Sequence, residues 1–135
     1  NIPSKYFAKE NNHMIKVKSQ IEKNIRTKEF VVIDARSKKR FLGLEPEPRP
    51  EVKSGFIENS KSLPFNELIN NKTNTFIDKK DLKKKFNSLE INGPNIVTSC
   101  GSSVTAATLA LAYFLINDDY IPKIYLGSWT EYGKK

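Results

Sequence analysis

The stretch from residue 95 to residue 115 constrains the fold of this chain more strongly than any other. It opens with Asn-Ile-Val-Thr-Ser, a short run rich in β-branched residues that is typical of a buried strand. It closes with Ala-Ala-Thr-Leu-Ala-Leu-Ala-Tyr-Phe-Leu, which is typical of a buried helix. Between the two lies Cys100, the only cysteine of the chain, followed by the small residues Gly101, Ser102 and Ser103. The pattern predicts a cysteine at the carboxyl end of a strand, immediately before a helix.

This position favours a chemical role for Cys100. Open α/β sheets bind ligands at the carboxyl ends of their strands, where helices begin. A helix start offers free N–H groups and the positive end of a dipole, and both stabilise a thiolate. Small loop residues leave room for a ligand and allow the amides to turn inward. The structural alternative is that Cys100 is simply a small buried hydrophobe, as many lone cysteines are.

Other short apolar runs are predicted to be strands. They cover residues 14–17, 30–34, 62–64 and 123–126, and the third has room for only a very short strand. Residues 43–54 contain Pro46, Pro48 and Pro50 and are predicted to form a loop, as are the polar residues 70–75.

Helices are predicted in the segments between these strands. Ser19 and Glu22 have capping-box spacing, and so have Ser128 and Glu131, so each serine is predicted to start a helix. Asp78 is predicted to cap a further helix over residues 79–89. Because strands and helices alternate, we expect an α/β fold with a small parallel β-sheet and helices on both faces.

Length and charge narrow the functional classes. The chain has 135 residues, enough for one domain with a core, and a net charge of +8. The basic residues at positions 79–85 are predicted to be the solvated face of a helix, because Leu82 and Phe86 are spaced to face inward. We therefore expect no nucleic-acid partner, and without an apolar run of membrane-spanning length we expect no membrane.

Several short pieces of sequence carry a family resemblance when they are taken together. They are Asp34-Ala35-Arg36, Arg40-Phe41-Leu42-Gly43, Glu45-Pro46-Glu47-Pro48-Arg49, Ser54-Gly55, Leu63-Pro64-Phe65, Cys100-Gly101-Ser102-Ser103-Val104-Thr105-Ala106 and Gly127-Ser128-Trp129. Their order and spacing resemble a rhodanese domain, and more narrowly the C-terminal, catalytic half of a two-domain 3-mercaptopyruvate or thiosulfate sulfurtransferase. The resemblance implies a rhodanese-like domain over residues 28–135, preceded by a linker and an initial helix over residues 1–27. It also implies an N-terminal rhodanese domain that is absent from this chain.

The resemblance implies that Cys100 is the nucleophile of a sulfurtransferase. In the family, the thiolate attacks the sulfur of a donor, keeps that sulfur as a persulfide, and passes it to a thiol or another nucleophile. The amides of the persulfide loop would stabilise the negative charge, as helix-start amides do for other anions. The loop residues are Gly101, Ser103, Val104 and Thr105, together with Ser102.

The resemblance also implies roles for other side chains. Arg40 and Arg49 match residues that grip the carboxylate and keto oxygen of the donor, a task that suits a planar guanidinium. From the residues alone, both would be interpreted as exposed arginines on a charged loop. Ser102 matches a catalytic hydroxyl that works with a His and an Asp of the N-terminal domain and helps to protonate the leaving enolate. Asp34 is predicted to support the site indirectly, by accepting bonds from loop amides or by pairing with an arginine.

The loop composition indicates the donor. Family members that use thiosulfate carry basic side chains where this chain has Gly101 and Ser102, so 3-mercaptopyruvate is the predicted donor and thiosulfate is the alternative. Ser103 departs from the family, which usually has Gly there, and a side chain constrains the loop if that position needs a positive φ. His13, the only histidine, is not expected to replace the histidine of the absent domain.

Two other functional classes remain as alternatives. A cysteine phosphatase of related architecture needs an arginine six residues after the cysteine to hold the phosphoryl oxygens, and Ala106 occupies that place. A non-catalytic docking or sulfur-carrier module is the other alternative, and the retention of Cys100, Arg40 and Arg49 argues against the docking form.

The same reasoning gives expectations for partners and location. The resemblance implies a small-molecule sulfur donor and a thiol acceptor, such as thioredoxin or a ubiquitin-like sulfur carrier linked to tRNA thiolation. The N-terminal domain of the same protein is a further partner. One cysteine and one histidine are too few for a typical zinc site, so we expect no metal and no cofactor. A single cysteine fits a reducing compartment, which favours the cytoplasm, with the mitochondrion as an alternative.

Overall fold

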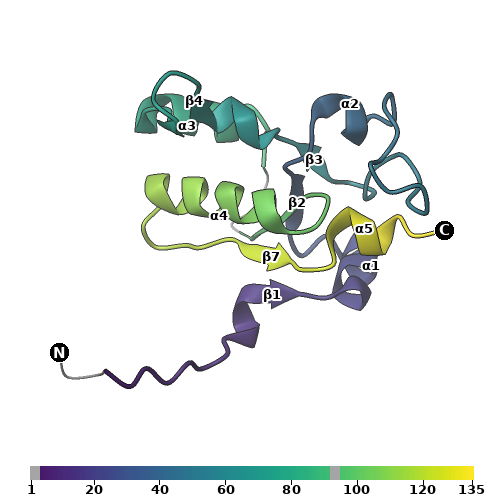
Figure 1. Ribbon diagram of the computed structural model, residues 1–135, viewed down its shortest axis with the longest axis horizontal. Coiled ribbons are helices and arrows are strands. Elements are labelled where there is room, and N and C mark those ends of the chain that lie inside the picture. The colour runs from purple at the N-terminus through teal and green to yellow at the C-terminus, as the bar shows by residue number, and fades with distance from the viewer. Residues whose placement is uncertain (1–3, 92–94) are drawn as a thin grey trace.

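A computed structural model describes residues 4–91 and 95–135 of the chain. Its main feature is a five-stranded sheet in which every neighbouring pair of strands is parallel, as expected. The strands follow one another in space in the order β1-β7-β6-β2-β3, and Figure 1 labels four of them, β1, β7, β2 and β3. Their bounds are β1 Ile15–Lys16, β2 Val31–Asp34, β3 Lys61–Ser62, β6 Ile96–Ser99 and β7 Lys123–Tyr125.

Helices cover both faces of this sheet, which confirms the predicted α/β architecture. One face carries α3 (Lys79–Asn87), α4 (Val104–Ile116) and the 3₁₀ helix η2 (Phe65–Leu68). The other face carries α1 (Lys18–Thr27) and the short helix α5 (Ser128–Tyr132).

The core is divided between the two faces because successive strand residues point in opposite directions. In β2, Ile33 packs against the α3 and α4 side while Val32 packs against the α1 and α5 side. In β6, Ile96 and Val97 divide in the same way. All four side chains are at most 3% exposed, so the central strands bury apolar residues on both faces, as a sheet covered on both sides requires.

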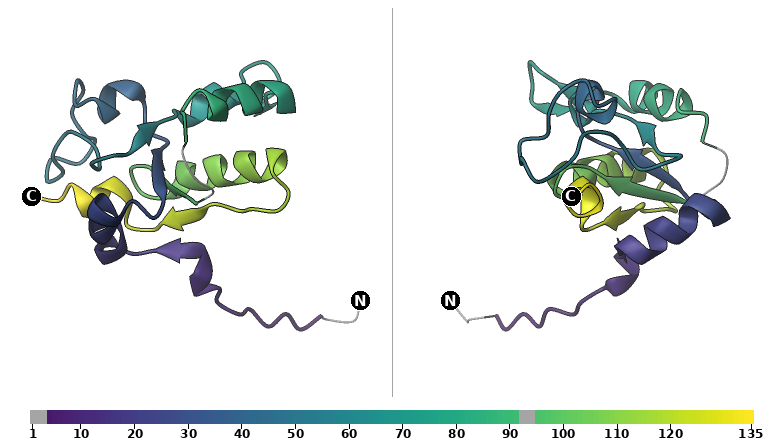
Figure 2. Two further views of the ribbon diagram at one scale, coloured as in Figure 1. Left: turned by 180° about the vertical axis from the view of Figure 1, so that it is seen from behind. Right: turned by 90° about the vertical axis from the view of Figure 1, so that its right-hand side faces the viewer.

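Residues 15–27, which precede the predicted domain boundary, are part of the sheet and its covering layer. The division at residue 28 remains a prediction, but β1 pairs with β7 and Ile21 of α1 is 1% exposed in the core. Residues 15–27 therefore contribute a strand and a helix to the sheet and its covering layers. Figures 1 and 2 show the described residues before the 3₁₀ helix η1 (Asn12–Met14) extending away from the body of the molecule.

Two local predictions are wrong and one is confirmed. Helix α1 begins at Lys18 rather than behind Ser19, and the side chain of Gln20 accepts a hydrogen bond from the backbone N–H of Val17 at 3.1 Å. Part of the predicted loop at 70–75 belongs to a hairpin of β4 (Ile69–Asn70) and β5 (Thr75–Phe76). Asp78 caps α3 as expected, accepting the backbone N–H of Asp81 at 2.9 Å.

The sheet register brings the ends of two strands together. Asp34, the last residue of β2, is the direct partner of Ser99, the last residue of β6. The chain continues from Ser99 into Cys100, so the carboxylate-bearing end of β2 and the cysteine lie at the same edge of the sheet. The short helix α2 (Lys38–Phe41), which begins behind Ser37, follows β2 at this edge.

Candidate active site

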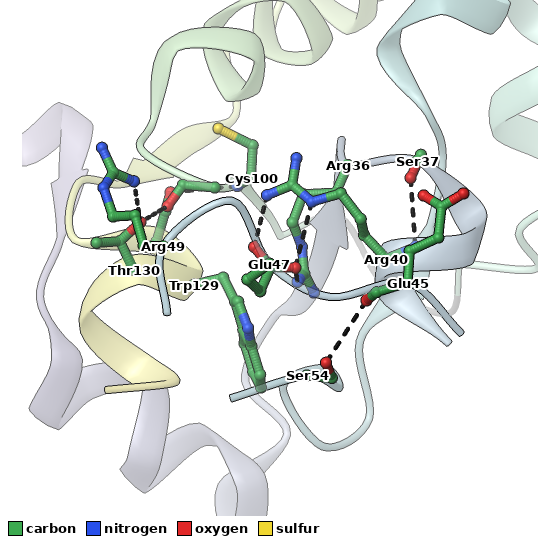
Figure 3. A network of polar contacts seen from close by, with 12 residues as sticks. Arg36, Ser37, Arg40, Glu45, Glu47, Arg49, Ser54, Cys100, Trp129 and Thr130 are labelled. Carbon is green, nitrogen blue, oxygen red and sulfur yellow. Dashed lines mark hydrogen bonds and ion pairs between the residues drawn. The ribbon is translucent and has the colours of Figure 1, made fainter. Parts of the chain in front are cut away.

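Cys100 lies where the sequence places it, directly after β6 and before α4. The residue is 2% exposed. Its backbone oxygen accepts a hydrogen bond from the N–H of Trp129 at 2.9 Å, which ties the cysteine to the start of α5. Figure 3 shows the sulfur pointing away from the Trp129 ring, with Arg49 and Arg40 approaching from opposite sides of the view.

The loop after the cysteine presents unused backbone amides. Among the described residues, the N–H groups of Gly101, Ser102, Val104 and Thr105 have no hydrogen-bond acceptor. They stand at the start of α4, where the positive end of the helix dipole also lies. Such a set of amides stabilises an anion held between them.

Ser103, where the family usually has Gly, adopts a backbone conformation with a positive φ. Its φ is 66° and its ψ is −8°, so a residue with a side chain occupies the left-handed region. Its amide does not join the unused set, because it donates to Oγ of Ser128 at 3.2 Å. Its own hydroxyl donates to the carbonyl oxygen of Ser102 at 2.7 Å.

Ser128 is an anchor for this loop that the sequence did not reveal. Its Oγ accepts the N–H of Cys100 at 3.1 Å as well as that of Ser103, and donates to the carbonyl of Tyr125 at 2.9 Å. The residue is fully buried and its φ is 50°. The prediction that Ser128 caps its own helix is therefore wrong: Gly127 is the N-cap, and the Ser128 hydroxyl is used by the cysteine loop.

Arg40, on α2, reaches the cysteine loop. A methyl group placed on Gly101 would lie 3.1 Å from Nη2 of Arg40, so the guanidinium lies against the backbone of that glycine. Nη2 donates to Oε2 of Glu47 at 2.6 Å, and Nε donates to Oε1 at 3.2 Å. The hydrogen bonds that Arg40 donates to Glu47 raise the pKa of Arg40 further above its ordinary value, and an arginine is positively charged in any case.

Arg49 reaches the same loop indirectly. Its Nη1 donates to the hydroxyl of Thr130 at 2.8 Å, and that hydroxyl donates to the carbonyl oxygen of Gly101 at 2.6 Å. The N–H of Thr130 donates to the same oxygen at 2.9 Å. Arg49 is exposed, so its guanidinium remains open to a ligand while Thr130 holds its position.

Asp34 pairs with the buried Arg36 behind the loop. Both side chains are 1% exposed, and Nη2 of Arg36 lies 2.8 Å from Oδ2 of Asp34. Asp34 also accepts the backbone N–H of Arg36 at 2.9 Å. Nη1 of Arg36 donates to Glu47 at 2.8 Å, and the guanidinium packs over the ring of Trp129 at 4.7 Å. A continuous chain of ion pairs thus runs from Asp34 to Arg40.

The structure gathers most of the predicted site residues at one edge of the sheet. Cys100, Gly101, Arg40 and Arg49 are joined by the contacts above. Ser102 is exposed, and its hydroxyl has no partner among the described residues. Val104 is 75% exposed on the outer side of the loop, whereas Thr105 is half-buried.

The sequence analysis assigned no role at the cysteine loop to four residues of this cluster, namely Arg36, Glu47, Ser128 and Thr130. The sequence does mark Glu47 as a candidate ion-pair partner. It lies between Pro46 and Pro48, and the two predicted arginines stand on either side of it along the chain. No comparable signal marked Ser128 or Thr130, whose contacts with the loop span 25 to 29 positions.

Within residues 4–91 and 95–135, no group of three or more His, Cys, Asp or Glu side chains is placed to hold a metal ion. In the same ranges, no helix combines the length and apolar character needed to cross a membrane.

Comparison with known families identifies the domain type. The family model described as rhodanese-like domain matches residues 17–135. The match covers the sheet from β2 onward, the cysteine loop and both arginines, and it begins just before α1.

Individual relatives point in the same direction. The chain is 37% identical to the mitochondrial thiosulfate/3-mercaptopyruvate sulfurtransferase 1 of Arabidopsis thaliana, over 97% of this chain and 34% of the relative. It is 34% identical to the 3-mercaptopyruvate sulfurtransferase of Mus musculus, over 96% of this chain and 43% of the relative. The chain therefore spans well under half the length of the curated relatives it matches.

A solved structure confirms the fold. The sulfur transferase subunit of yeast mitochondrial complex I, described as sub-stoichiometric, superposes with a TM-score of 0.79 at 31% identity. The superposition covers 96% of this chain and 48% of that one.

Proposed function

The chain belongs to the family of rhodanese-like domains, and on that premise we propose that it transfers sulfur through a persulfide on Cys100. One observation carries the proposal: the cysteine stands at the carboxyl end of β6, before a loop whose amides have no other acceptor among the described residues. A persulfide carries its negative charge one atom beyond the cysteine sulfur. Amides at a helix start can stabilise that charge without a metal or cofactor.

The proposed half-reaction with 3-mercaptopyruvate balances as follows. The thiolate of Cys100 attacks the thiol sulfur of the donor, a sulfur–sulfur bond forms and the carbon–sulfur bond breaks. The electron pair stays on carbon as the pyruvate enolate, which takes up the thiol proton to become pyruvate. The transferred sulfur stays on Cys100 as the outer atom of a persulfide anion. A thiol acceptor then takes up this outer sulfur and leaves the cysteine as a thiolate. Ser102 is proposed to assist the proton transfer.

We infer that 3-mercaptopyruvate is preferred over thiosulfate. Positions 101 and 102 carry Gly and Ser instead of basic side chains, and a larger residue at position 101 would meet Arg40. Arg40 and Arg49 are proposed to hold the carboxylate and keto oxygen, because a planar guanidinium can bond two oxygens at once. Thiosulfate is the second candidate, since relatives named for both donors match this chain.

The rest of the machinery is proposed to come from outside this chain. The matched relatives are more than twice as long, and Ser102 has an unpartnered hydroxyl at the exposed edge of the loop among the described residues. An additional rhodanese domain would supply a histidine and an acidic residue to it. The acceptor is proposed to be a thiol such as thioredoxin or a ubiquitin-like sulfur carrier, in the cytoplasm or the mitochondrion.

Steady-state assays with both donors test the proposal. With a small thiol as acceptor, pyruvate release from 3-mercaptopyruvate should exceed sulfite release from thiosulfate at equal concentrations. Cys100→Ser should abolish both activities while unfolding at the same temperature as the parent chain. Faster sulfite release would reverse the assignment of the donor. Turnover that survives in Cys100→Ser would contradict the role of the cysteine.

A further inference from the structure

Glu47 is the acidic side chain that joins two arginines, Arg36 and Arg40, behind the cysteine loop. Its carboxylate accepts from Arg36 Nη1 at 2.8 Å, from Arg40 Nε at 3.2 Å and from Arg40 Nη2 at 2.6 Å. The side chain is 4% exposed, so water screens these contacts little. Two of the nitrogens of Arg40 are therefore already committed to a carboxylate. Figure 3 shows Glu47 directly beneath the Arg40 guanidinium.

The charges behind the cysteine loop cancel. Asp34 and Glu47 each contribute one negative charge, and Arg36 and Arg40 each contribute one positive charge. This group, three buried side chains and the 26% exposed Arg40, is thus neutral as a whole. Arg49, which is exposed and forms no ion pair among the described residues, adds a positive charge that contacts the loop through Thr130.

We propose that Glu47 determines donor specificity: by cancelling the charge of Arg40, its carboxylate matches the site to a donor with one negative charge and disfavours a dianion. The inference rests on the sulfur transfer proposed above. With 3-mercaptopyruvate the incoming donor carries only its carboxylate charge. With thiosulfate, the outer sulfur of a dianion moves to Cys100 and the sulfur–sulfur bond of the donor breaks to release sulfite, again a dianion.

The physical basis is that electrostatic energy scales with the charge of the ligand. Removing the negative charge of Glu47 adds one unit of positive charge beside the donor. Even with the dielectric constant of bulk water and a separation of roughly 4 Å, such a unit improves binding of a monoanion about fivefold and of a dianion by about the square of that factor. The ratio of the two donors should therefore move about fivefold toward thiosulfate.

The test compares the two donors on one variant, because a ratio cancels any loss of folded protein. In Glu47→Gln, kcat/KM for thiosulfate divided by kcat/KM for 3-mercaptopyruvate should rise about fivefold, and the rise should shrink as salt is added. Glu47→Asp keeps the charge and should leave the ratio within about twofold of the parent value. A ratio that is unchanged in Glu47→Gln, or that changes equally in Glu47→Asp, would overturn the inference.

Glu45→Gln is the matched control. It removes the same charge two positions away, from a side chain that is 44% exposed and lies 3.5 Å from Lys39. Because that pair is open to solvent and outside the buried group, the donor ratio should not move. A shift as large as that of Glu47→Gln would mean that net charge alone is responsible, and would refute the specific role of Glu47.

A binding measurement separates this inference from the proposed reaction. Alkylation of Cys100 by iodoacetamide is followed in the presence of sulfate, a dianion, or pyruvate, a monoanion. Glu47→Gln should improve protection by sulfate more than protection by pyruvate. If protection changes in this way but neither donor forms a persulfide on Cys100, the charge matching is upheld and sulfur transfer is rejected. Persulfide formation with unchanged relative protection would reject the charge matching alone.

Discussion

Substitution of Ser103 by glycine or by alanine tests the strain in the cysteine loop. At this position we expect the glycine variant to be the more stable of the two, the reverse of the usual order. With φ at 66°, the residue lies in the left-handed region, which costs a residue with a Cβ about 1–2 kcal/mol. Glycine avoids that cost but loses about 0.5–1 kcal/mol to the greater freedom of the unfolded chain. The difference predicts that Ser103→Gly is more stable than Ser103→Ala by about 0.5–1 kcal/mol. At an ordinary position alanine would be the more stable of the two.

Urea unfolding at fixed pH and temperature measures this difference directly. Both variants lose the bond from the Ser103 hydroxyl to the Ser102 carbonyl, so its contribution cancels in the comparison. The same pair of substitutions at Ser102, which has no positive φ, is the control and should show the ordinary order, with alanine more stable. If Ser103→Ala proves as stable as Ser103→Gly, the loop is not strained at this position and the reasoning fails.

Two further predictions concern stability away from the loop. Burial and the hydrogen bond to Glu131 raise the pKa of Tyr125, so the folded state keeps a proton that the unfolded state loses above about pH 10. The contribution of this group to the free energy of unfolding is therefore fully present below that pH and is lost as the pH rises above it. Tyr125→Phe should reduce the slope of this loss by about 1.4 kcal/mol per pH unit, measured by urea unfolding at a series of pH values. An unchanged slope would show that Tyr125 is not the titrating group. Asp78→Ala removes the cap of α3 and should lower the free energy of unfolding by about 1 kcal/mol, whereas Asp118→Ala, on an exposed turn, should lower it by less than about 0.5 kcal/mol.

The central layers were predictable because their sequence signals are strong and local. The apolar residues of β2 and β6 cannot be placed anywhere but between two helical layers, and the apolar run of α4 buries Leu109 and three alanines. The hairpin of β4 and β5 was not predictable in the same way. Its strands are two residues long, and polar residues fill the turn between them as they would fill any loop.

The site divides along similar lines. Cys100 could be placed because a strand and a helix flank it in sequence, and Arg40 and Arg49 could be proposed only through the family pattern. Ser128 was assigned to its own helix because capping-box spacing is common, whereas its hydroxyl satisfies amides at positions 100 and 103. Contacts between segments so far apart depend on the whole fold, and no periodicity in the sequence encodes them.

The most direct test of the account is the intact mass of the chain after brief exposure to 3-mercaptopyruvate. We predict a gain of one sulfur atom that a thiol reductant reverses and that is absent in Cys100→Ser. The same experiment on a longer form that carries the proposed additional rhodanese domain would show whether that domain raises the rate. If neither form gains sulfur from 3-mercaptopyruvate or thiosulfate, Cys100 is not a persulfide carrier and the domain is a docking module.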